Sequence, residues 1–462
     1  MISKIIESQR AYFHSGATLD ISFRLGMLKR LQAALEKWEK PLTDALWTDL
    51  HKSYQEAYLT ELSIVKGEVK NHLRHLRKWA KPKRRPTPIK MFPSRSRIVS
   101  EPLGNTLIMA PWNYPVQLLL NPLVGAISAG CTAVLKPSPY VPTVSAVLEQ
   151  MITDTFDPHY VAIVQGNRDV NLALLAQRFD LIFFTGSPSL GKLVMEAASK
   201  YLTPVILELG GKSPCIVDRQ ADIKTAAKRI AWGKTLNSGQ TCIAPDYLLI
   251  HEEVKEPFIE AFAKAVKELH GSDIAKSKHY VRMVNDRAFE RVKGYLAEGD
   301  IRYGGRAHAA ERFIEPTLLD TRINLADPTA DEQAGAKGVL TEEIFGPVFP
   351  MLTFNNLDEV QGYITRREKP LAFYYFGNEA AGLDLIHRTS SGGACINDTI
   401  MHIANEHIPF GGVGNSGMGG YHGEESFRVF SHRRSVVLTG TWIDLPFRYM
   451  PYRMFGLVKK IV

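Results

Sequence analysis

The spacing of apolar residues changes near residue 105. Before that point, residues 25–50 and 59–79 carry apolar side chains three and four positions apart among charged neighbours, which predicts amphipathic helices. After that point, short apolar runs alternate with amphipathic stretches. This alternation predicts βαβ units, in which helices cover both faces of a parallel sheet.

Two series of such units follow one another along the chain. The first series predicts strands at residues 106–110, 133–135, 161–164, 181–184 and 205–207, and helices at 143–156, 169–178 and 190–200. The second predicts strands at 247–251, 348–354, 371–376 and 394–396, and a long helix at 256–270. A final strand is predicted at 435–438. We therefore expect two α/β units that divide near residues 208–213.

The composition fits a globular chain of more than one domain. A chain of 462 residues is too long for one ordinary core, and 45% hydrophobic with 23% charged residues is typical of globular proteins. Residues 102–135 contain no charged side chain, and this uncharged stretch is long enough to suggest a membrane span. Pro111, Pro115 and Pro122 interrupt it, so a buried strand, turn, helix and second strand is the better interpretation.

Charge and cysteine content narrow the possible partners. The net charge is +8, and ten Lys or Arg residues without an acid lie between Arg74 and Arg97. Prolines break this run and no nucleic-acid motif accompanies it, so an extended connector is favoured over a binding surface. Four scattered cysteines with no C-x-x-C pair argue against a disulfide framework and a metal site. The first ten residues lack the apolar core of a signal peptide, so a cytoplasmic location is expected.

A first motif, FTGSPSLG, occupies residues 184–191 between a predicted strand and helix. Gly186 and Ser187 fall at the strand's carboxyl end, where backbone N–H groups and the helix dipole favour a phosphate. The spacing is close to a P-loop, but Leu193 stands where that motif needs Ser or Thr for magnesium. A P-loop NTPase is therefore a weak alternative, and a plain strand–helix turn is another.

Two further motifs carry a carboxylate and a thiol. In ELGGKSP, Glu208 ends an apolar strand, and poor solvation there should raise its pKa toward that of a general base. The alternative is a Glu that caps a helix or pairs with Lys212. In NSGQTC, small and polar neighbours could expose the sulfur of Cys242, and an N–H cluster or a cation would favour its thiolate. The alternative for any single cysteine is a small buried core residue.

The last two motifs hold polar groups beside aromatic rings. In PWNYP, two prolines fix a loop in which the amide of Asn113 could donate to a developing oxyanion. In EEIFGPV, Glu343 and Phe345 are held beside a Gly-Pro pair. They could bind a ribose diol and pack on a flat ring, or form an ordinary helix-to-strand turn.

In this order and spacing, the five segments resemble the aldehyde dehydrogenase superfamily. NSGQTCIAPDY and PFGGVGNSGMGGYHG look most like its class 3 branch, which includes dimeric enzymes for aromatic and medium- to long-chain aliphatic aldehydes. The resemblance implies an α/β fold with a Rossmann-type cofactor domain, an α/β catalytic domain and a small bridging and oligomerisation arm. The implied bounds are 1–83 with 103–208, 209–410, and 84–102 with 430–440, followed by a tail at 441–462.

The resemblance also implies roles for individual residues. Cys242 is the expected nucleophile and Glu208 the general base, and Asn113 with the backbone N–H of Cys242 forms the oxyanion hole. For NAD or NADP, the implied contacts come from Trp112, Lys136, Gly186, Ser187, Gly191, Glu343 and Phe345. Pro139 stands where related enzymes often carry a Glu that binds the adenosine ribose, which makes NADP more plausible.

The expected function is NAD(P)-dependent oxidation of an aldehyde to the acid, through a cysteine thioester that water hydrolyses. One alternative is a CoA-acylating aldehyde dehydrogenase or an acyl-CoA reductase. Another is a non-catalytic structural or membrane-associated protein on the same fold. We expect a homodimer and no nucleic-acid partner. The basic aromatic tail could pack on the partner subunit, touch a membrane surface or cover the substrate funnel.

Overall fold

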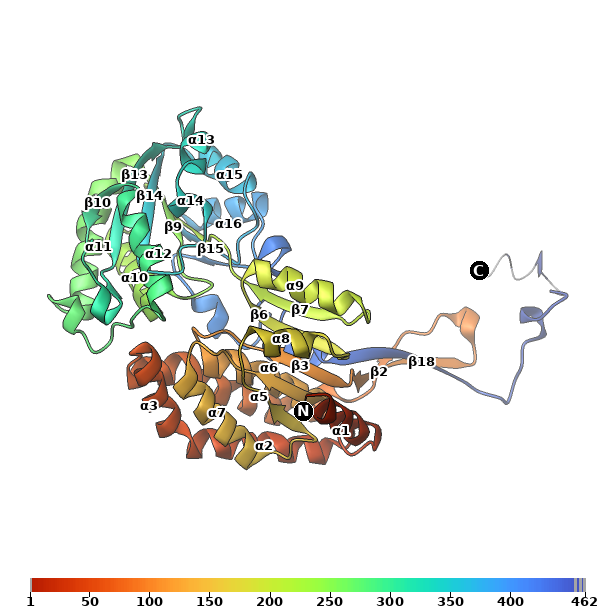
Figure 1. Ribbon diagram of the computed structural model, residues 1–462. Coiled ribbons are helices and arrows are strands. Elements are labelled where there is room, and N and C mark those ends of the chain that lie inside the picture. Colours follow the sequence, from red (N-terminus) through yellow and green to blue (C-terminus); the bar gives the residue numbers. More distant parts are fainter. Residues whose placement is uncertain (1, 453–454, 457–458, 460–462) are drawn as a thin grey trace.

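A computed structural model describes residues 2–452, 455–456 and 459. Two α/β lobes lie one above the other, and a narrow arm projects to one side (Figure 1). Among the residues expected in the C-terminal tail, Arg453, Leu457 and Lys460 are outside the described set. The helices in the described part of the chain fall short of the length and hydropathy needed to cross a membrane.

The N-terminal region is helical, as the apolar spacing predicts. Its elements are α1 (Ile2–His14), α2 (Ile21–Lys37), α3 (Glu39–Leu50), α4 (Tyr54–Ala57), a π-helical turn η1 (Tyr58–Leu62) and α5 (Ser63–Trp79). The predicted helix at 25–50 is two helices that meet at Trp38. The π-helical turn makes up the first part of the segment predicted at 59–79. Such turns widen a helix locally and often occur at functional sites.

A six-stranded sheet forms the core of the first lobe, in the order β17-β7-β6-β3-β4-β5. Its strands are β3 (Asn105–Met109), β4 (Thr132–Lys136), β5 (Val161–Ile163), β6 (Leu181–Gly186), β7 (Val205–Leu209) and the short β17 (Gly417–Met418). Only β17 pairs antiparallel in this sheet. The helices are α6 (Pro115–Ala129), α7 (Pro142–Thr155), α8 (Arg168–Leu175) and α9 (Pro188–Ser199). All five strands of the first predicted series are confirmed.

The uncharged stretch is a buried helix between two strands, as predicted. Every residue of α6 is buried, and a helix that is apolar on all sides belongs in a protein interior as well as in a membrane. Pro115 stands in its first turn, where a missing N–H costs no hydrogen bond. The helix packs against α2, α5 and α17 (Glu424–Val429).

A seven-stranded sheet forms the core of the second lobe, in the order β10-β13-β14-β9-β8-β15-β16. Its strands are β8 (Pro214–Val217), β9 (Tyr247–His251), β10 (Asp300–Tyr303), β13 (Thr317–Asn324), β14 (Val348–Phe354), β15 (Ala372–Phe376) and β16 (Gly393–Ile396). Its helices are α10 (Ile223–Thr235), α11 (Lys255–His270), α12 (Asp286–Gly294), α13 (Ala330–Gly335), α14 (Gly338–Thr341), α15 (Leu357–Thr365) and α16 (Glu379–Arg388). The sequence prediction missed β8, β10 and β13, because two of them are short and polar residues interrupt the third.

Shorter elements complete the described chain. They are β11 (Ala307–His308), β12 (Phe313–Ile314), η2 (Ile89–Met91), η3 (Leu236–Gly239), η4 (Glu252–Val254), η5 (Ile274–Lys276), η6 (Tyr295–Ala297), η7 (Ala309–Glu311), η8 (Met401–Ala404), η9 (Gly414–Ser416) and η10 (Pro446–Arg448).

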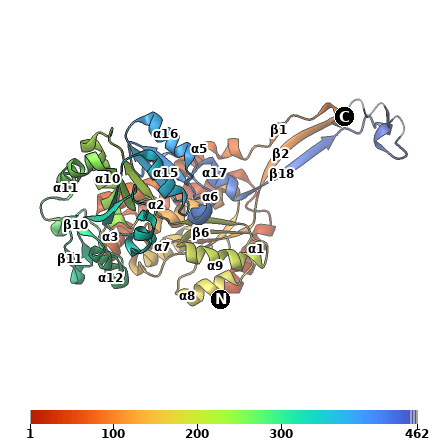
Figure 2. The ribbon, with the colours of Figure 1, turned by 90° about the horizontal axis from the view of Figure 1, so that it is seen from above.

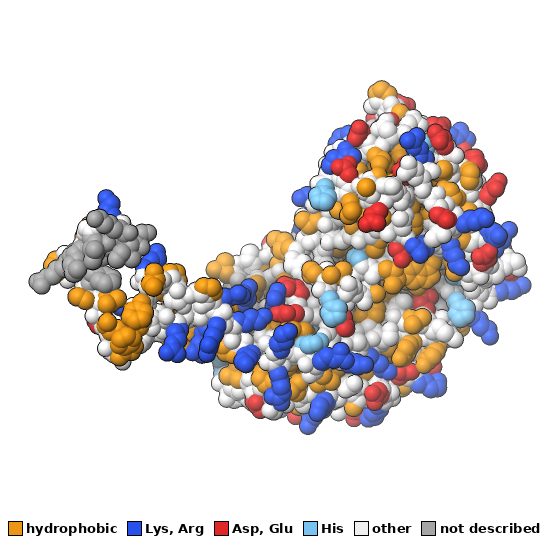
Figure 3. All heavy atoms as spheres, turned by 180° about the vertical axis from the view of Figure 1, so that it is seen from behind, with side chains coloured by type: hydrophobic (Ala, Val, Ile, Leu, Met, Phe, Trp, Pro, Cys, Tyr) orange, Lys and Arg blue, Asp and Glu red, His pale blue; other side chains and the backbone are white. Residues whose placement is uncertain are grey.

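The arm is a three-stranded antiparallel sheet of β1 (Lys83–Arg85), β2 (Ser94–Pro102) and β18 (Ser431–Thr439). The basic stretch is therefore extended, as predicted, and β18 begins four residues before the predicted strand. Figure 2 shows the arm leaving the body at one end, and Figure 3 shows Lys and Arg side chains along it. The described part of the tail continues beyond the arm and away from both lobes (Figures 1 and 2).

The two sheets are joined directly where β7 ends and β8 begins. Leu209 is the last residue of β7 and Pro214 is the first of β8, so only four residues link the lobes at this point. The carboxyl ends of parallel strands are where open α/β sheets place their ligand sites. The link therefore brings the carboxyl end of β7 next to the second lobe.

Candidate active site

Cys242 lies in a tight loop that follows η3. Asn237, Ser238 and Gly239 all have positive φ angles, of 51°, 52° and 72°, a conformation that non-glycine residues rarely adopt. The side chain of Gln240 braces the loop by donating to the Asn237 carbonyl at 3.1 Å. Hydrogen bonds thus hold a strained backbone that leaves the sulfur of Cys242 half-buried.

Glu208 occupies the end of β7, as the apolar strand predicts. The residue is 3% exposed, and neither carboxyl oxygen has a hydrogen-bond partner among the described residues. Burial raises the pKa of this carboxyl well above its ordinary value. The alternative pairing with Lys212 is wrong, because the Lys212 ammonium pairs with Asp246 and donates to the Glu342 carbonyl oxygen at 2.8 Å.

Two cavities meet at these two side chains. One has a volume of about 320 Å³ and the other about 240 Å³. Both are lined by Leu118, Thr185, Glu208, Leu209 and Cys242. The thiol and the carboxyl group therefore stand between two separate binding spaces.

The larger cavity is almost entirely apolar. Its walls come from η1, α5, α6, α10, η8 and the loops around Cys242 and Phe410. The other lining residues are Leu59, Thr60, Ile64, Tyr114, Gln117, Trp232, Leu236, Thr241, Ile243, Leu371, Ile400, Met401, Ile403, Ala404, Phe410 and Tyr421. Such a surface suits an apolar ligand whose single polar group reaches Cys242.

The smaller cavity carries the polar and aromatic groups of the predicted cofactor site. The rings of Trp112 and Phe345 pack edge to face, with their centroids 5.4 Å apart. Gly186 and Ser187, at the start of α9, line the same space as Glu343. A helix N-terminus suits a phosphate and an acidic side chain suits a ribose hydroxyl, so this cavity is compatible with a dinucleotide.

Two of the predicted cofactor residues are not among those that line the smaller cavity. Gly191 lies in α9, where an added Cβ would meet the Leu209 side chain at 2.8 Å, so it allows close helix–strand packing. Lys136 ends β4 and donates to the Pro137 carbonyl at 2.7 Å. Burial lowers the pKa of this ammonium to about 8.

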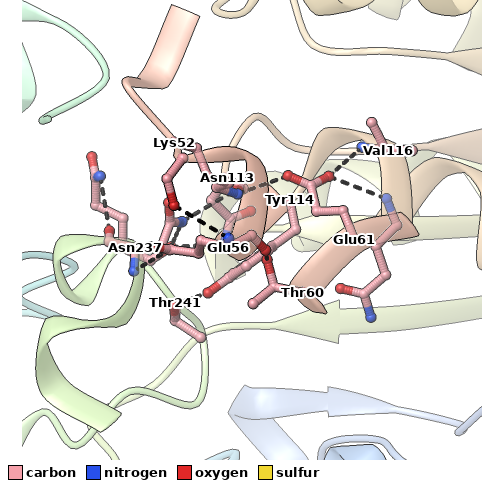
Figure 4. Close-up of polar contacts among 12 residues, drawn as sticks. Lys52, Glu56, Thr60, Glu61, Asn113, Tyr114, Val116, Asn237 and Thr241 are labelled. Atoms are coloured by element: carbon pink, nitrogen blue, oxygen red, sulfur yellow. Dashed lines mark hydrogen bonds and ion pairs between the residues drawn. The ribbon is translucent and has the colours of Figure 1, made fainter. Parts of the chain in front are cut away.

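Asn113 joins the cavity wall to the Cys242 loop. Its side-chain amide donates one hydrogen bond of 3.0 Å to the Gln240 carbonyl. An amide has two N–H donors, so the second remains for a ligand in the cavity that Asn113 lines. Tyr114 adds a 2.6 Å hydrogen bond to Thr241 (Figure 4).

The electrostatic surroundings keep Cys242 protonated at rest. The pKa of the thiol is raised to about 12. Burial is the largest cause, and the neighbouring carboxyl groups of Glu343 and Glu208 also raise it. The backbone N–H groups of Cys242 and Ile243 act in the opposite direction. The predicted N–H cluster is therefore present, but burial and the two acids outweigh it.

The structure also brings in residues that the sequence interpretation did not assign. Arg291 donates to the backbone carbonyls of Glu343 and Ile344 at 3.0 and 2.7 Å and so fixes the EEIFGPV turn. Tyr421 lines the apolar cavity, and its buried hydroxyl has no hydrogen-bond partner in the described part of the chain. Arg291 belongs to no motif, whereas Tyr421 is the one tyrosine of the quoted segment PFGGVGNSGMGGYHG and could have been singled out there.

Comparison with known proteins identifies the family. The aldehyde dehydrogenase family matches residues 1–436. The chain is 44% identical over 456 residues to the 4,4'-diaponeurosporen-aldehyde dehydrogenase of Staphylococcus aureus. This alignment covers 98% of this chain and 97% of the relative. It is also 42% identical to the dimeric NADP-preferring aldehyde dehydrogenase of the dog, over 97% of this chain and 98% of the relative. The chain belongs to the aldehyde dehydrogenase family.

The solved structures agree with this assignment. Staphylococcus aureus AldH in a substrate-bound state superimposes with a TM-score of 0.95 at 43% identity, covering 100% of this chain and 99% of the other. Human aldehyde dehydrogenase family 3 member B1 is 43% identical over 93% of this chain and 90% of the relative. The predicted fold and the resemblance to the class 3 branch are confirmed.

The protein is therefore an NAD(P)-dependent aldehyde dehydrogenase. Its substrate is an aldehyde, and its cofactor is NAD or NADP. Among the described residues, no cluster of three or more His, Cys, Asp or Glu side chains could hold a metal ion.

Proposed function

We propose that this aldehyde dehydrogenase oxidises an apolar aldehyde to the carboxylic acid through a thioester on Cys242, which water hydrolyses with the help of Glu208. One observation carries the proposal: Cys242 and Glu208 line both cavities. A substrate in the apolar cavity and a cofactor in the other cavity would then meet at the sulfur atom.

The first step forms a bond between the sulfur and the aldehyde carbon. Cys242 is a thiol at rest, so its proton passes to solvent water as the carbon–sulfur bond forms. The carbonyl oxygen becomes an oxyanion, for which the free N–H of the Asn113 amide and the backbone N–H of Cys242 are the proposed donors. One such donor typically contributes about 2.7–4 kcal/mol to the stability of a transition state.

The residues of the smaller cavity fit NAD or NADP. Gly186 and Ser187 would hold the pyrophosphate at the start of α9, Glu343 the nicotinamide ribose, and Trp112 and Phe345 the ring. When bound, the cofactor supplies the acceptor for the hydride that oxidation of the sulfur adduct releases. Lys136 keeps its proposed role beside the adenosine ribose, and Gly191 keeps its proposed role in α9, the helix whose start would hold the pyrophosphate. Pro139 places no carboxylate at the position of the usual ribose-binding Glu, which favours acceptance of NADP.

The second step breaks the thioester. Glu208 has no partner for either carboxyl oxygen, so it can accept a hydrogen bond from water once it has lost its proton. It then takes a proton from that water as the water oxygen adds to the thioester carbon. The carbon–sulfur bond breaks as the acid forms, and the proton on Glu208 passes to the departing sulfur. A protein that transfers its acyl group to CoA does not need this base, so the free Glu208 favours hydrolysis.

The cavity lining indicates the substrate class. The larger cavity presents aliphatic and aromatic side chains over most of its wall, and its volume is about 320 Å³. Medium- to long-chain aliphatic aldehydes and aromatic aldehydes would bury the most apolar surface there. Short polar aldehydes would leave the wall uncovered.

We further propose that the chain forms a homodimer through the arm. Strand β18 lies at an edge of its sheet, and Val437 and Leu438 on it are 49% and 43% exposed. Beyond it, Trp442 is 71% exposed apart from its contact with Phe92, at a ring distance of 5.6 Å. An open strand edge beside exposed apolar side chains suits a partner subunit. Tail packing on that subunit is preferred to membrane contact.

The experiment combines a substrate panel with both cofactors. Alkanals of increasing length and benzaldehydes are incubated with NAD or NADP, with and without CoA, while absorbance follows the reduced cofactor and mass spectrometry identifies the product. We expect free acid in every arm, kcat/KM that rises with chain length, and a preference for NAD over NADP below ~10³-fold, or about 4 kcal/mol. Acyl-CoA as the main product would overturn the proposal.

A further inference from the structure

Lys52 is an unusual lysine because its ammonium group is completely buried. Its side chain is 0% exposed, as is that of Glu61, and Lys52 Nζ donates to Glu61 Oε1 at 2.7 Å. A second hydrogen bond of 3.0 Å goes to the backbone carbonyl of Asn113. The ammonium also lies over the ring of Tyr114, 4.3 Å from its centroid. All three directions of the ammonium are therefore occupied.

Glu61 connects this lysine to helix α6. Its other carboxyl oxygen, Oε2, accepts hydrogen bonds from the backbone N–H groups of Val116 at 2.8 Å and Gln117 at 3.3 Å. These groups belong to the first turn of α6, which has no helical acceptor for them. The π-helical turn η1 contains Glu61 and also supplies Leu59 and Thr60 to the cavity wall.

The peptide carbonyl of Asn113 is held from two sides. It accepts from Lys52 on one side and from the side-chain amide of Asn237 at 3.0 Å on the other. The same Asn237 amide donates to the Gln240 carbonyl at 3.0 Å, which is also the acceptor of the Asn113 side chain. Figure 4 shows these groups converging from the loop between α3 and α4, from η1, from the PWNYP loop and from η3 before Cys242.

We propose that Lys52 is a positioning residue for this reaction. Its ammonium fixes the peptide of Asn113 against the first turn of α6 and against the loop of Cys242. The side-chain amide of Asn113 is therefore held in one orientation toward the aldehyde oxygen. This inference rests on the proposed function, in which Asn113 stabilises the oxyanion, and it assigns no contact between Lys52 and the substrate.

A purely structural role is the competing explanation. A buried ion pair that loses one partner leaves an uncompensated charge, and this can unfold a protein whatever the pair does for catalysis. The test therefore uses Lys52→Met together with the double variant Lys52→Met/Glu61→Gln. In the double variant both charges are gone, and the Gln oxygen can still accept from the first turn of α6. Circular dichroism and thermal melts confirm which variants fold.

The kinetic readout separates kcat from KM. If Lys52 positions the oxyanion donor, the folded double variant loses kcat by roughly 10–100-fold, because a misplaced catalytic group loses rate. Its KM for a long alkanal changes by less than about threefold, because the apolar wall that binds the chain is intact. A matched change, Lys255→Met, removes the ammonium that pairs with Asp320 at 2.5 Å in the second lobe. That control should keep the kcat of the natural protein.

A cycle with Asn113→Ala decides whether Lys52 acts through Asn113. If it does, adding Lys52→Met/Glu61→Gln to Asn113→Ala lowers kcat by less than about twofold, because residues that act as a unit are not additive. If Lys52→Met/Glu61→Gln lowers kcat by the same factor in the Asn113→Ala background as in the natural protein, the inference is overturned. So does unchanged kcat in the folded double variant. Failure of the proposed function looks different, because Asn113→Ala alone would then leave kcat unchanged.

Discussion

Two buried carboxyl groups in the first lobe have opposite surroundings. Glu208 is 3% exposed and has no hydrogen-bond partner on either oxygen. Glu61 is 0% exposed and accepts from the Lys52 ammonium and from two backbone N–H groups of α6. Both groups lie in apolar protein, so burial alone does not distinguish them.

The difference lies in where the unsatisfied hydrogen-bonding capacity remains. A buried polar group without a hydrogen-bond partner lowers the stability of the folded state. At Glu208 the two unpartnered oxygens are available to water beside Cys242. At Glu61 the same capacity is used entirely inside the protein, and the surrounding loops are fixed. The proposed reactive centre thus keeps unused hydrogen-bonding capacity, while the carboxyl group of Glu61 has its partners inside the protein.

The largest expected effect comes from removing the nucleophile. Cys242→Ala should lower kcat by at least ~10⁴-fold, because no sulfur adduct can form. Cofactor binding, measured by fluorescence quenching of the protein, should persist. Ser replacements at Cys131, Cys215 and Cys395 serve as matched controls and should keep turnover. Oxidation at the natural rate by Cys242→Ala would refute the assignment.

The next effect concerns the unpartnered carboxyl group. Glu208→Gln should slow hydrolysis by roughly 10²–10⁴-fold, the usual contribution of a general base. Stopped-flow absorbance should then record one rapid equivalent of reduced cofactor per active site, followed by a stall. Absence of the burst in a folded variant would place Glu208 before oxidation, and its assigned role would be wrong.

The same two carboxyl groups should respond oppositely in stability. Glu61→Gln leaves the Lys52 charge unpaired and should cost about 3–5 kcal/mol of unfolding free energy. Glu208→Gln should raise the melting temperature, because the native state holds the Glu208 proton to a pH well above the unfolded pKa. Proton binding at Glu208 therefore stabilises the natural protein at low pH, and this stabilisation is lost as the pH rises above about 4.5. Melts from pH 5 to 8 should show the advantage of Glu208→Gln growing with pH, and a constant difference would contradict it.

A smaller effect should appear in the reactivity of the thiol. Burial raises the pKa of Glu343 to about 8, and its carboxylate in turn raises the pKa of Cys242. Above pH 8, Glu343→Gln should therefore alkylate faster with iodoacetamide than the natural protein, by about tenfold for each pKa unit lost. Below pH 7 the two rates should converge, because Glu343 is then neutral. Equal rates at pH 9 would show that Glu343 does not contribute to the thiol pKa.

The smallest expected change in turnover is that from the tail. Deletion of residues 448–462 should weaken the dimer in light scattering while kcat/KM for aldehydes stays within about twofold, because no described tail residue lines the apolar cavity. Vesicle co-sedimentation provides the comparison. Loss of vesicle binding or a changed chain-length preference, with the dimer intact, would favour the membrane or funnel-cover alternatives.

Much of the fold could be predicted from local patterns. The apolar runs that became β3 to β7, β9, β14 and β15 are short and largely buried, and the run that became β16 is half-buried. Short apolar runs between turn residues can be recognised as strands without their neighbours. Strand β13 (Thr317–Asn324) was missed because Asp320 and Arg322 interrupt its apolar run. Asp320 is buried by its partner Lys255, which lies far away in the sequence. Long-range pairing of this kind leaves no local signal.

For this protein the sequence alone pointed to the proposed chemistry, because each candidate reactive side chain sits in a motif whose Gly and Pro residues fix a local turn. Glu208 before Gly210, Asn113 between two prolines and Cys242 after Gly239 could all be found in this way. Tertiary structure decided which of these groups have hydrogen-bond or ion-pair partners. The missing partner of Glu208, the raised pKa of Cys242 and the burial of Lys52 against Glu61 depend on atoms that only folding brings together. Desolvation and hydrogen bonding act over a few ångströms in space, whatever the separation along the chain.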